Sequence, residues 1–180
     1  MAFTNSPLVV YTKISPNRTK NRNHSIDTIT IHCVVGQCSV EALGSVFAAT
    51  ERQASSNYGV GADGRIGMYC EEKDRSWCSS NAANDHRAIT IEVASDTTHP
   101  YAVNDKAYAA LIDLCVDICK RNGIKRLVSP SKDEIHVILK LAGMVIPYLK
   151  KATAQELMSE YASLCSDGEA TQQKYIIDLL

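Results

Sequence analysis

The chain has 180 residues, which is enough for one compact domain with short extensions. Its 19 lysine and arginine residues nearly balance 20 aspartate and glutamate residues, so composition argues against binding to nucleic acid or to an anionic membrane surface. The longest mainly apolar stretch, 137–149, contains Lys140 and is too short to span a bilayer.

The cysteines and the first residues indicate where the protein is made. Seven cysteines, an odd number, are spread through the sequence rather than packed into a short disulfide framework, so we expect reduced thiols. Residues 1–17 lack a basic region followed by an apolar run, and we therefore expect no secretory signal. A soluble protein synthesised in the cytoplasm is the resulting expectation.

The first predicted elements are an extended arm and a strand. Residues 1–26 are rich in polar side chains, and we interpret them as an N-terminal arm laid over a domain. Residues 27–33 alternate β-branched side chains, which predicts a strand with His32 near its C-terminal end. There the imidazole can project from the sheet edge into a cleft. A lone histidine in such a place is nevertheless more often a structural group than a metal ligand.

A capped helix and a hairpin come next. Ser39 is a suitable N-cap, and apolar residues recur after it at helical spacing. Short apolar segments at 57–60 and 65–69 flank Asp63-Gly64, a dipeptide typical of a tight hairpin turn. The helix positions expected to face the core are Val40, Leu43, Val46 and Phe47.

A second long strand and a long helix follow. Residues 88–94 form an apolar, β-branched segment in which the charged Glu92 requires an explanation, either as a functional group or as a salt-bridged, edge-facing carboxylate. Residues 105–122 carry apolar side chains at helical spacing and are followed by Gly123, a typical helix C-cap. Further on, 134–141 fits a strand or a helix.

These elements predict an α/β fold with a central, mainly β sheet flanked by helices. We divide the chain into an N-terminal arm at 1–26, a domain at 27–150 and a C-terminal helical or linker tail at 151–180. Fold class alone does not determine function.

Four blocks of sequence carry a family resemblance. They are 29–37 (ITIHCVVGQ), 55–67 (SSNYGVGADGRIG), 75–80 (RSWCSS) and 88–93 (AITIEV). In this order and spacing they resemble the type-2 N-acetylmuramoyl-L-alanine amidases, which include phage endolysins and bacterial autolysins, and more distantly the peptidoglycan recognition proteins. The likeness runs from about residue 6 to 128. It implies an amidase/peptidoglycan-recognition-protein-like fold and a hydrolase that acts on the bacterial cell wall, after release from the cytoplasm.

The resemblance also implies roles for individual residues. In that family two histidines and a cysteine or aspartate hold zinc, and the fourth position stays open for water and the scissile carbonyl. His32 would be the first ligand and Glu92 the general base, while the Tyr58 hydroxyl would stabilise the metal-bound water or the oxyanion. Trp77 and Asn81 would line the muropeptide cleft. Without the resemblance, Tyr58 would be read as a packing residue, and for Trp77 a core tryptophan beside a solvated loop is an equal alternative.

The last third departs from the family pattern. His136 fits the position of the second histidine, but Met144 stands where the family has its cysteine, and a neutral thioether is a poor zinc ligand. Ala142 stands where relatives often have an oxyanion-binding lysine or threonine. Either His136 binds in a weakened site, or another group such as Cys165 or an acidic residue completes the metal site, or the segment after Val128 is unrelated.

Two functional hypotheses result. The first is a zinc-dependent amidase that cleaves the bond between N-acetylmuramic acid and L-alanine in peptidoglycan, with metal ligands His32 and His136. The alternative is a catalytically inactive module that binds peptidoglycan through the cleft around Tyr58 and Trp77, with a degraded zinc site.

Overall fold

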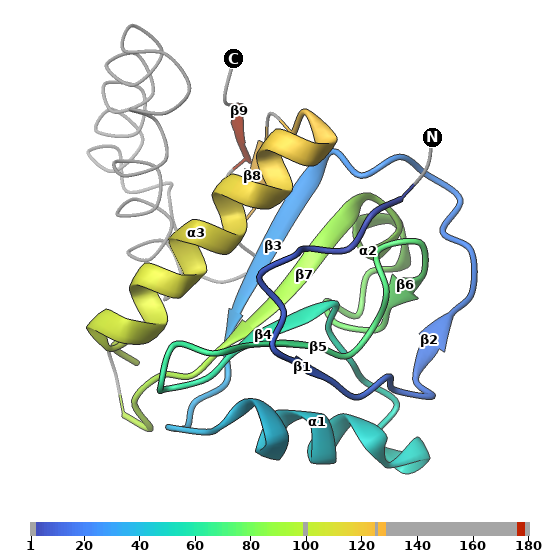
Figure 1. Ribbon diagram of the computed structural model, residues 1–180. Coiled ribbons are helices and arrows are strands. Elements are labelled where there is room, and N and C mark those ends of the chain that lie inside the picture. The colour runs from blue at the N-terminus through green and yellow to red at the C-terminus, as the bar shows by residue number, and fades with distance from the viewer. Residues whose placement is uncertain (1–2, 99–100, 125, 129–175, 179–180) are drawn as a thin grey trace, which may run out of the picture.

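The computed structural model describes residues 3–98, 101–124, 126–128 and 176–178 (Figure 1). Seven strands form one sheet in the order β1-β5-β4-β7-β3-β8-β9, and β2 and β6 form a small second sheet. The elements are β1 (Tyr11–Thr12), β2 (Arg18–Thr19), β3 (Thr28–Cys33), α1 (Val40–Ala48), the 3-10 turn η1 (Thr50–Arg52), β4 (Tyr58–Val60), β5 (Ile66–Met68), β6 (Arg75–Ser76), α2 (Ala82–Arg87), β7 (Ala88–Val93), α3 (Asp105–Asn122), β8 (Arg126–Val128) and β9 (Ile176–Asp178).

Parallel strands make up the centre of the large sheet. β3 lies between β7 and β8 and is parallel to both, and β7 also pairs in parallel with β4. The antiparallel pairs, β4 with β5 and β8 with β9, lie nearer the edges. The strands predicted at 27–33 and 88–94 are thus neighbours in the centre, where the first four residues of each are buried, and both are rich in the β-branched side chains that favour strands. The predicted α/β class, with a central sheet and flanking helices, is confirmed.

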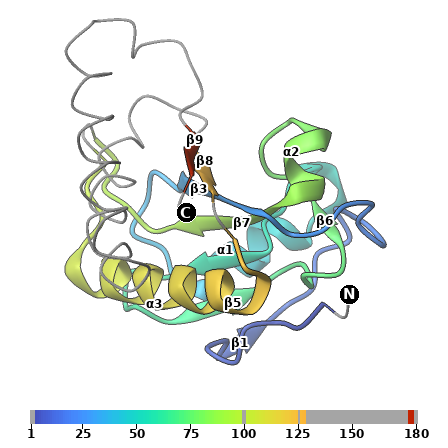
Figure 2. The same cartoon turned by 90° about the horizontal axis from the view of Figure 1, so that it is seen from above.

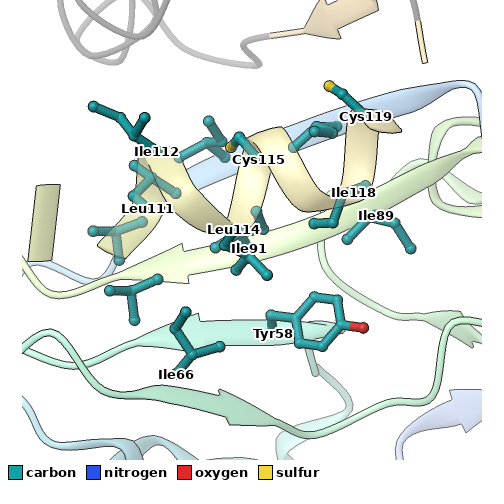
Figure 3. Close-up of a cluster of buried hydrophobic side chains, with 14 of the residues drawn as sticks. Tyr58, Ile66, Ile89, Ile91, Leu111, Ile112, Leu114, Cys115, Ile118 and Cys119 are labelled. Atoms are coloured by element: carbon teal, nitrogen blue, oxygen red, sulfur yellow. The ribbon is translucent and has the colours of Figure 1, made fainter. Parts of the chain in front are cut away.

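Helix α3 covers one face of the sheet (Figures 1 and 2). Its buried stripe includes Leu111, Leu114 and Ile118, which pack over Ile89 and Ile91 of β7 (Figure 3). The helix begins where the Asn104 side chain accepts a hydrogen bond from the backbone N–H of Ala107, and it ends at Gly123 with a φ of 61°. The predicted helix at 105–122, with its glycine cap, is confirmed.

Helix α1 packs on the opposite face, against β4 and β5. Gly59 lies close to Leu43 and Tyr69, and a Cβ there would come within 2.9 Å of the Leu43 side chain. Ser39 caps the helix as predicted, since its side chain accepts a hydrogen bond from the backbone N–H of Ala42. Val46, predicted to face the core, is instead 46% exposed. It lies off the buried stripe of Val40, Leu43, Gly44 and Phe47, and a helix this short buries only one stripe.

The N-terminal segment runs along the domain and adds strands to both sheets. β1 pairs in parallel with β5, and β2 pairs antiparallel with β6. Arg22 is 6% exposed and donates hydrogen bonds to the carbonyl oxygens of Glu72, Asp74, His86 and Ala88. The described part of the predicted arm is therefore fastened to the domain by backbone pairing and by one buried guanidinium.

The structure describes residues 176–178 of the predicted tail, which form β9. β9 pairs with β8, whereas the segment at 134–141 lies outside the described residues. Within the part of the chain that the structure describes, no helix combines the length and the apolar character needed to cross a membrane. No disulfide bond joins the six described cysteines to one another.

Candidate metal centre

His32 and Glu92 lie directly opposite each other on two neighbouring parallel strands. His32 is the fifth residue of β3, and the β3–β7 register pairs it with Glu92. Paired residues of adjacent strands project to the same face, and successive residues alternate between faces. Ile31 and Ile91, one position earlier, pair with each other and are buried in the cluster under α3. The imidazole and the carboxylate therefore project together from the other face.

Cys78 adds a third ligand-type side chain to this pair. The ligating atoms of His32, Cys78 and Glu92 all lie within 4.8 Å of one another. The Cys78 thiol donates to Oε1 of Glu92 at 3.8 Å. Cys78 comes from the segment that joins β6 to α2, so three separate parts of the chain contribute to the cluster.

A buried carboxylate holds the backbone around Cys78. Asp85 of α2 is 2% exposed and accepts hydrogen bonds from the backbone N–H groups of Cys78 at 3.0 Å and Ser79 at 3.2 Å. It also accepts one from the Ser79 hydroxyl at 2.6 Å. Because Asp85 lies in the helix that follows this loop, the bonds fix the loop against α2.

Two threonines connect the same region to the central strands. Thr90 and the Ser76 hydroxyl are 2.7 Å apart, and Thr30 accepts a hydrogen bond from the Asn84 amide at 3.1 Å. Each threonine stands two residues before a cluster residue and therefore shares its face of the sheet. The strands thus hold β6 and α2 on the face where His32 projects.

Burial shifts the pKa values of His32 and Cys78 in opposite directions. It lowers the pKa of His32, partly opposed by the Asp85 carboxylate, and so favours the neutral imidazole that can bind a metal. Burial, followed by the nearby carboxylates of Glu92 and Asp85, raises the pKa of the Cys78 thiol well above its ordinary value. A nucleophilic cysteine requires the opposite, electropositive kind of environment.

A pocket opens beside the cluster. Its cavity volume is about 300 Å³, and its wall includes both Trp77 and Asn81, the two predicted cleft residues. The Trp77 indole N–H donates to Thr19 at 3.0 Å, and the Asn81 side chain caps α2 by accepting from the backbone N–H of Asn84 at 3.2 Å. The remaining lining residues are Gln53, Ala54, Arg75, Cys78, Ser80, Ala82 and Asp85.

The sequence matches the family model described as N-acetylmuramoyl-L-alanine amidase over residues 22–139, more than half of the chain. The chain belongs to this amidase family. The family match extends beyond Val128, the last residue of β8, and includes His136.

Solved structures of amidases share the fold. A selenomethionine derivative of AmpD matches with 16% identity and a TM-score of 0.53, covering 68% of this chain and 81% of AmpD. The amidase LysC from Clostridium intestinale matches with 16% identity and a TM-score of 0.52 over 67% of this chain and 78% of LysC. The Staphylococcus aureus hydrolase AmiA, solved with its ligand, matches with 19% identity and a TM-score of 0.53 over 68% and 60% of the two chains. No curated protein sequence matches the chain.

The structure does not bring Tyr58 to the cluster of this amidase-family domain, which corrects the role predicted for it. Tyr58 pairs with Ile91, so its ring lies on the α3 face, opposite to Glu92, and is fully buried (Figure 3). Its hydroxyl donates to the buried Glu72 at 2.6 Å and accepts from the backbone N–H of Ser6 at 2.9 Å. Arg121 pairs with the same carboxylate at 2.6 Å. The hydroxyl is therefore part of a structural network.

Replacing Tyr58 with phenylalanine should destabilise the protein without slowing wall hydrolysis. The change deletes a hydrogen bond to a buried carboxylate, for which a loss of about 2 kcal/mol in the free energy of unfolding is expected. Urea unfolding and turbidity assays of cell walls would measure the two effects. Tyr11→Phe, which alters a half-buried tyrosine hydroxyl on β1, is the control. A stable Tyr58→Phe protein with lost activity would restore the catalytic role.

The candidate ligands His136 and Cys78 remain to be compared with the sequence prediction. His136 lies outside the described residues, as do Ala142, Met144 and Cys165, so the predicted second ligand stays a prediction. Cys78 was missed, although it stands in the block 75–80 that carries the family resemblance. The cysteine is 46 residues from His32 in sequence, and no short ligand spacing marks it.

Proposed function

We propose that the protein is a zinc-dependent amidase that hydrolyses the bond between N-acetylmuramic acid and the L-alanine of the stem peptide in peptidoglycan. The observation that carries this proposal is the juxtaposition of His32, Cys78 and Glu92 within 4.8 Å beside a pocket. Family membership supplies the class of reaction and substrate.

The side chains present suit zinc. An imidazole nitrogen, a thiol sulfur and a carboxylate oxygen are the donor types that zinc binds in proteins. A bound zinc ion would supply Lewis-acid chemistry, which polarises the scissile carbonyl and acidifies a water molecule. His32, with its burial-lowered pKa, is suited to hold the ion as a neutral imidazole. On the sequence pattern we propose His136 as a further ligand.

The chain's own groups would then carry the proton and position the substrate. The Glu92 carboxylate, which lies opposite His32, would accept a proton from the attacking water and return it to the departing amide nitrogen of L-alanine. Trp77 offers an apolar surface, and Asn81 contributes polar atoms to the pocket wall. That combination suits a ligand made of sugar and peptide.

Metal analysis combined with product analysis tests the proposal. The purified protein should contain about one zinc ion per chain, as a single three-ligand catalytic site would. It should release L-alanine amino termini from purified cell walls without creating new reducing ends. A chelator should abolish the activity, and added zinc should restore it. Wall binding without zinc and without new amino termini would instead establish the inactive binding module.

A further inference from the structure

We propose that Cys78 binds the metal ion through its thiolate, beside His32, and leaves Glu92 to handle the proton. This inference rests on the proposed function and names the sulfur ligand that the sequence pattern lacks at Met144. It also predicts that the anionic ligand comes from the segment between β6 and α2 rather than from the last third of the chain.

The distances allow this coordination with small side-chain movements. With Zn–S and Zn–N bonds of about 2.3 and 2.0 Å, two ligand atoms of a tetrahedral site lie roughly 3.5 Å apart. The three candidate atoms lie within 4.8 Å of one another, and the Cys78 sulfur is 3.8 Å from the Glu92 oxygen. Rotation of a few side-chain torsions is enough to bring the imidazole and the sulfur to bonding distance of one ion.

The backbone around Cys78 is fixed in advance. The Asp85 carboxylate accepts the N–H groups of Cys78 and Ser79, at 3.0 and 3.2 Å. On the preceding residue, Trp77, the backbone carbonyl accepts the Ser55 N–H at 3.0 Å, and the N–H donates to the Ser55 hydroxyl at 3.2 Å. Ligands held in this way by outer hydrogen bonds are typical of metal sites.

The charges around Cys78 favour a bound cation, and that cation would convert the thiol to a thiolate. The Cys78 thiol lies beside the carboxylate of Glu92, and a second buried carboxylate, Asp85, binds its backbone. A divalent cation would offset this concentration of negative charge, and a coordinating thiol is deprotonated by the ion itself. A thioether cannot provide such charge, whereas a thiolate and a neutral imidazole together form a donor pair common in zinc sites.

Cys33, Cys115 and Cys119 do not share this placement. Cys33 follows His32 directly, pairs with Val93 and therefore points to the other face of the sheet. Cys115 and Cys119 are buried on α3 under the opposite face. Among the described residues, the group of histidine, cysteine and acidic side chains close enough to hold a metal contains Cys78 as its one thiol.

Cobalt substitution provides a readout independent of hydrolysis. Co(II) bound to a thiolate absorbs in the near ultraviolet through sulfur-to-metal charge transfer, and Co(II) bound only to nitrogen and oxygen does not. The full-length protein loaded with Co(II) should show this band, and Cys33→Ser should keep it. Cys78→Ser should lose the band and lose cobalt affinity by more than the roughly 10 to 100-fold typical of outer-shell changes.

A second variant distinguishes loss of the sulfur ligand from a general folding defect. Cys78→His replaces the sulfur by a nitrogen ligand, so it should keep about one Co(II) per chain while losing the charge-transfer band. Persistence of the band in Cys78→Ser or Cys78→His would overturn the proposal, as would a Cys78 thiol that iodoacetamide alkylates at the same rate with and without cobalt. A normal band in a protein that does not cleave cell walls would refute the amidase function and leave the Cys78 ligand standing.

Discussion

Glu92→Gln is expected to reduce the turnover number on cell-wall muropeptides by roughly 100 to 10,000-fold, the usual contribution of a positioned general base. The amide is nearly the same size as the carboxylate, so the strand and its pairing with His32 should be preserved. It cannot accept the proton of the attacking water. Zinc content and binding to insoluble peptidoglycan should therefore stay at the wild-type level while amino-terminus release stops.

Glu51→Gln is the matched control for this experiment. Glu51 is an exposed glutamate of the 3-10 turn η1, and its substitution should leave turnover unchanged. Loss of zinc in Glu92→Gln would show that the carboxylate is a metal ligand rather than the base. Wild-type turnover would show that the proton goes to a group outside the cluster.

The alternation of side chains explains why part of this site could be predicted. Strand periodicity places His32 near the end of one apolar strand, and the charge of Glu92 within another marks it as unusual. The sequence does not state which strands are neighbours or in which register they pair. Here β3 and β7 pair in parallel with these two residues opposite each other, which puts both groups on one face.

The same rule explains the failure for Tyr58. Its place in a family block implied a cleft position, but the face of a strand residue depends on register. β4 pairs Tyr58 with Ile91 and Gly59 with Glu92, so the residue of β4 that shares the face of the cluster is a glycine. The buried partner that binds the tyrosine hydroxyl, Glu72, is 14 residues away and carries no sequence signal of that contact.

The sequence did not predict Cys78 as a cluster residue or the short helix α2, and the reason here is different. Asn81 was predicted to line the cleft, and the helix that follows it, Ala82–Arg87, is only 6 residues long. Its position depends on tertiary hydrogen bonds rather than on apolar periodicity: Asp85 accepts one from the backbone N–H of Cys78, and the Asn84 amide donates one to Thr30. Patterns along the chain reveal elements that bury a face, whereas a loop held by side-chain hydrogen bonds leaves little trace.

Asp85 is the residue on which that loop depends most. It is 2% exposed, and four of its hydrogen bonds go to Cys78 and Ser79. Its removal would leave two backbone N–H groups without their acceptor, and an orphaned buried donor costs about 1–3 kcal/mol. We therefore expect Asp85 to act on the cluster as a positioning residue, through its hydrogen bond to the backbone of Cys78.

Asp85→Ala is accordingly expected to lower the free energy of unfolding by about 3 kcal/mol and the affinity for zinc or cobalt by roughly 10 to 100-fold. Urea unfolding and competition with a chromophoric chelator measure the two quantities. Asp113→Ala, at an exposed position of α3, is the control and should change neither. Asp85→Asn keeps one acceptor oxygen and should recover part of the metal affinity. If Asp85→Ala lowered the free energy of unfolding but left the metal affinity of the folded fraction unchanged, the role of Asp85 would be structural only. That result would contradict a positioning role in the metal centre.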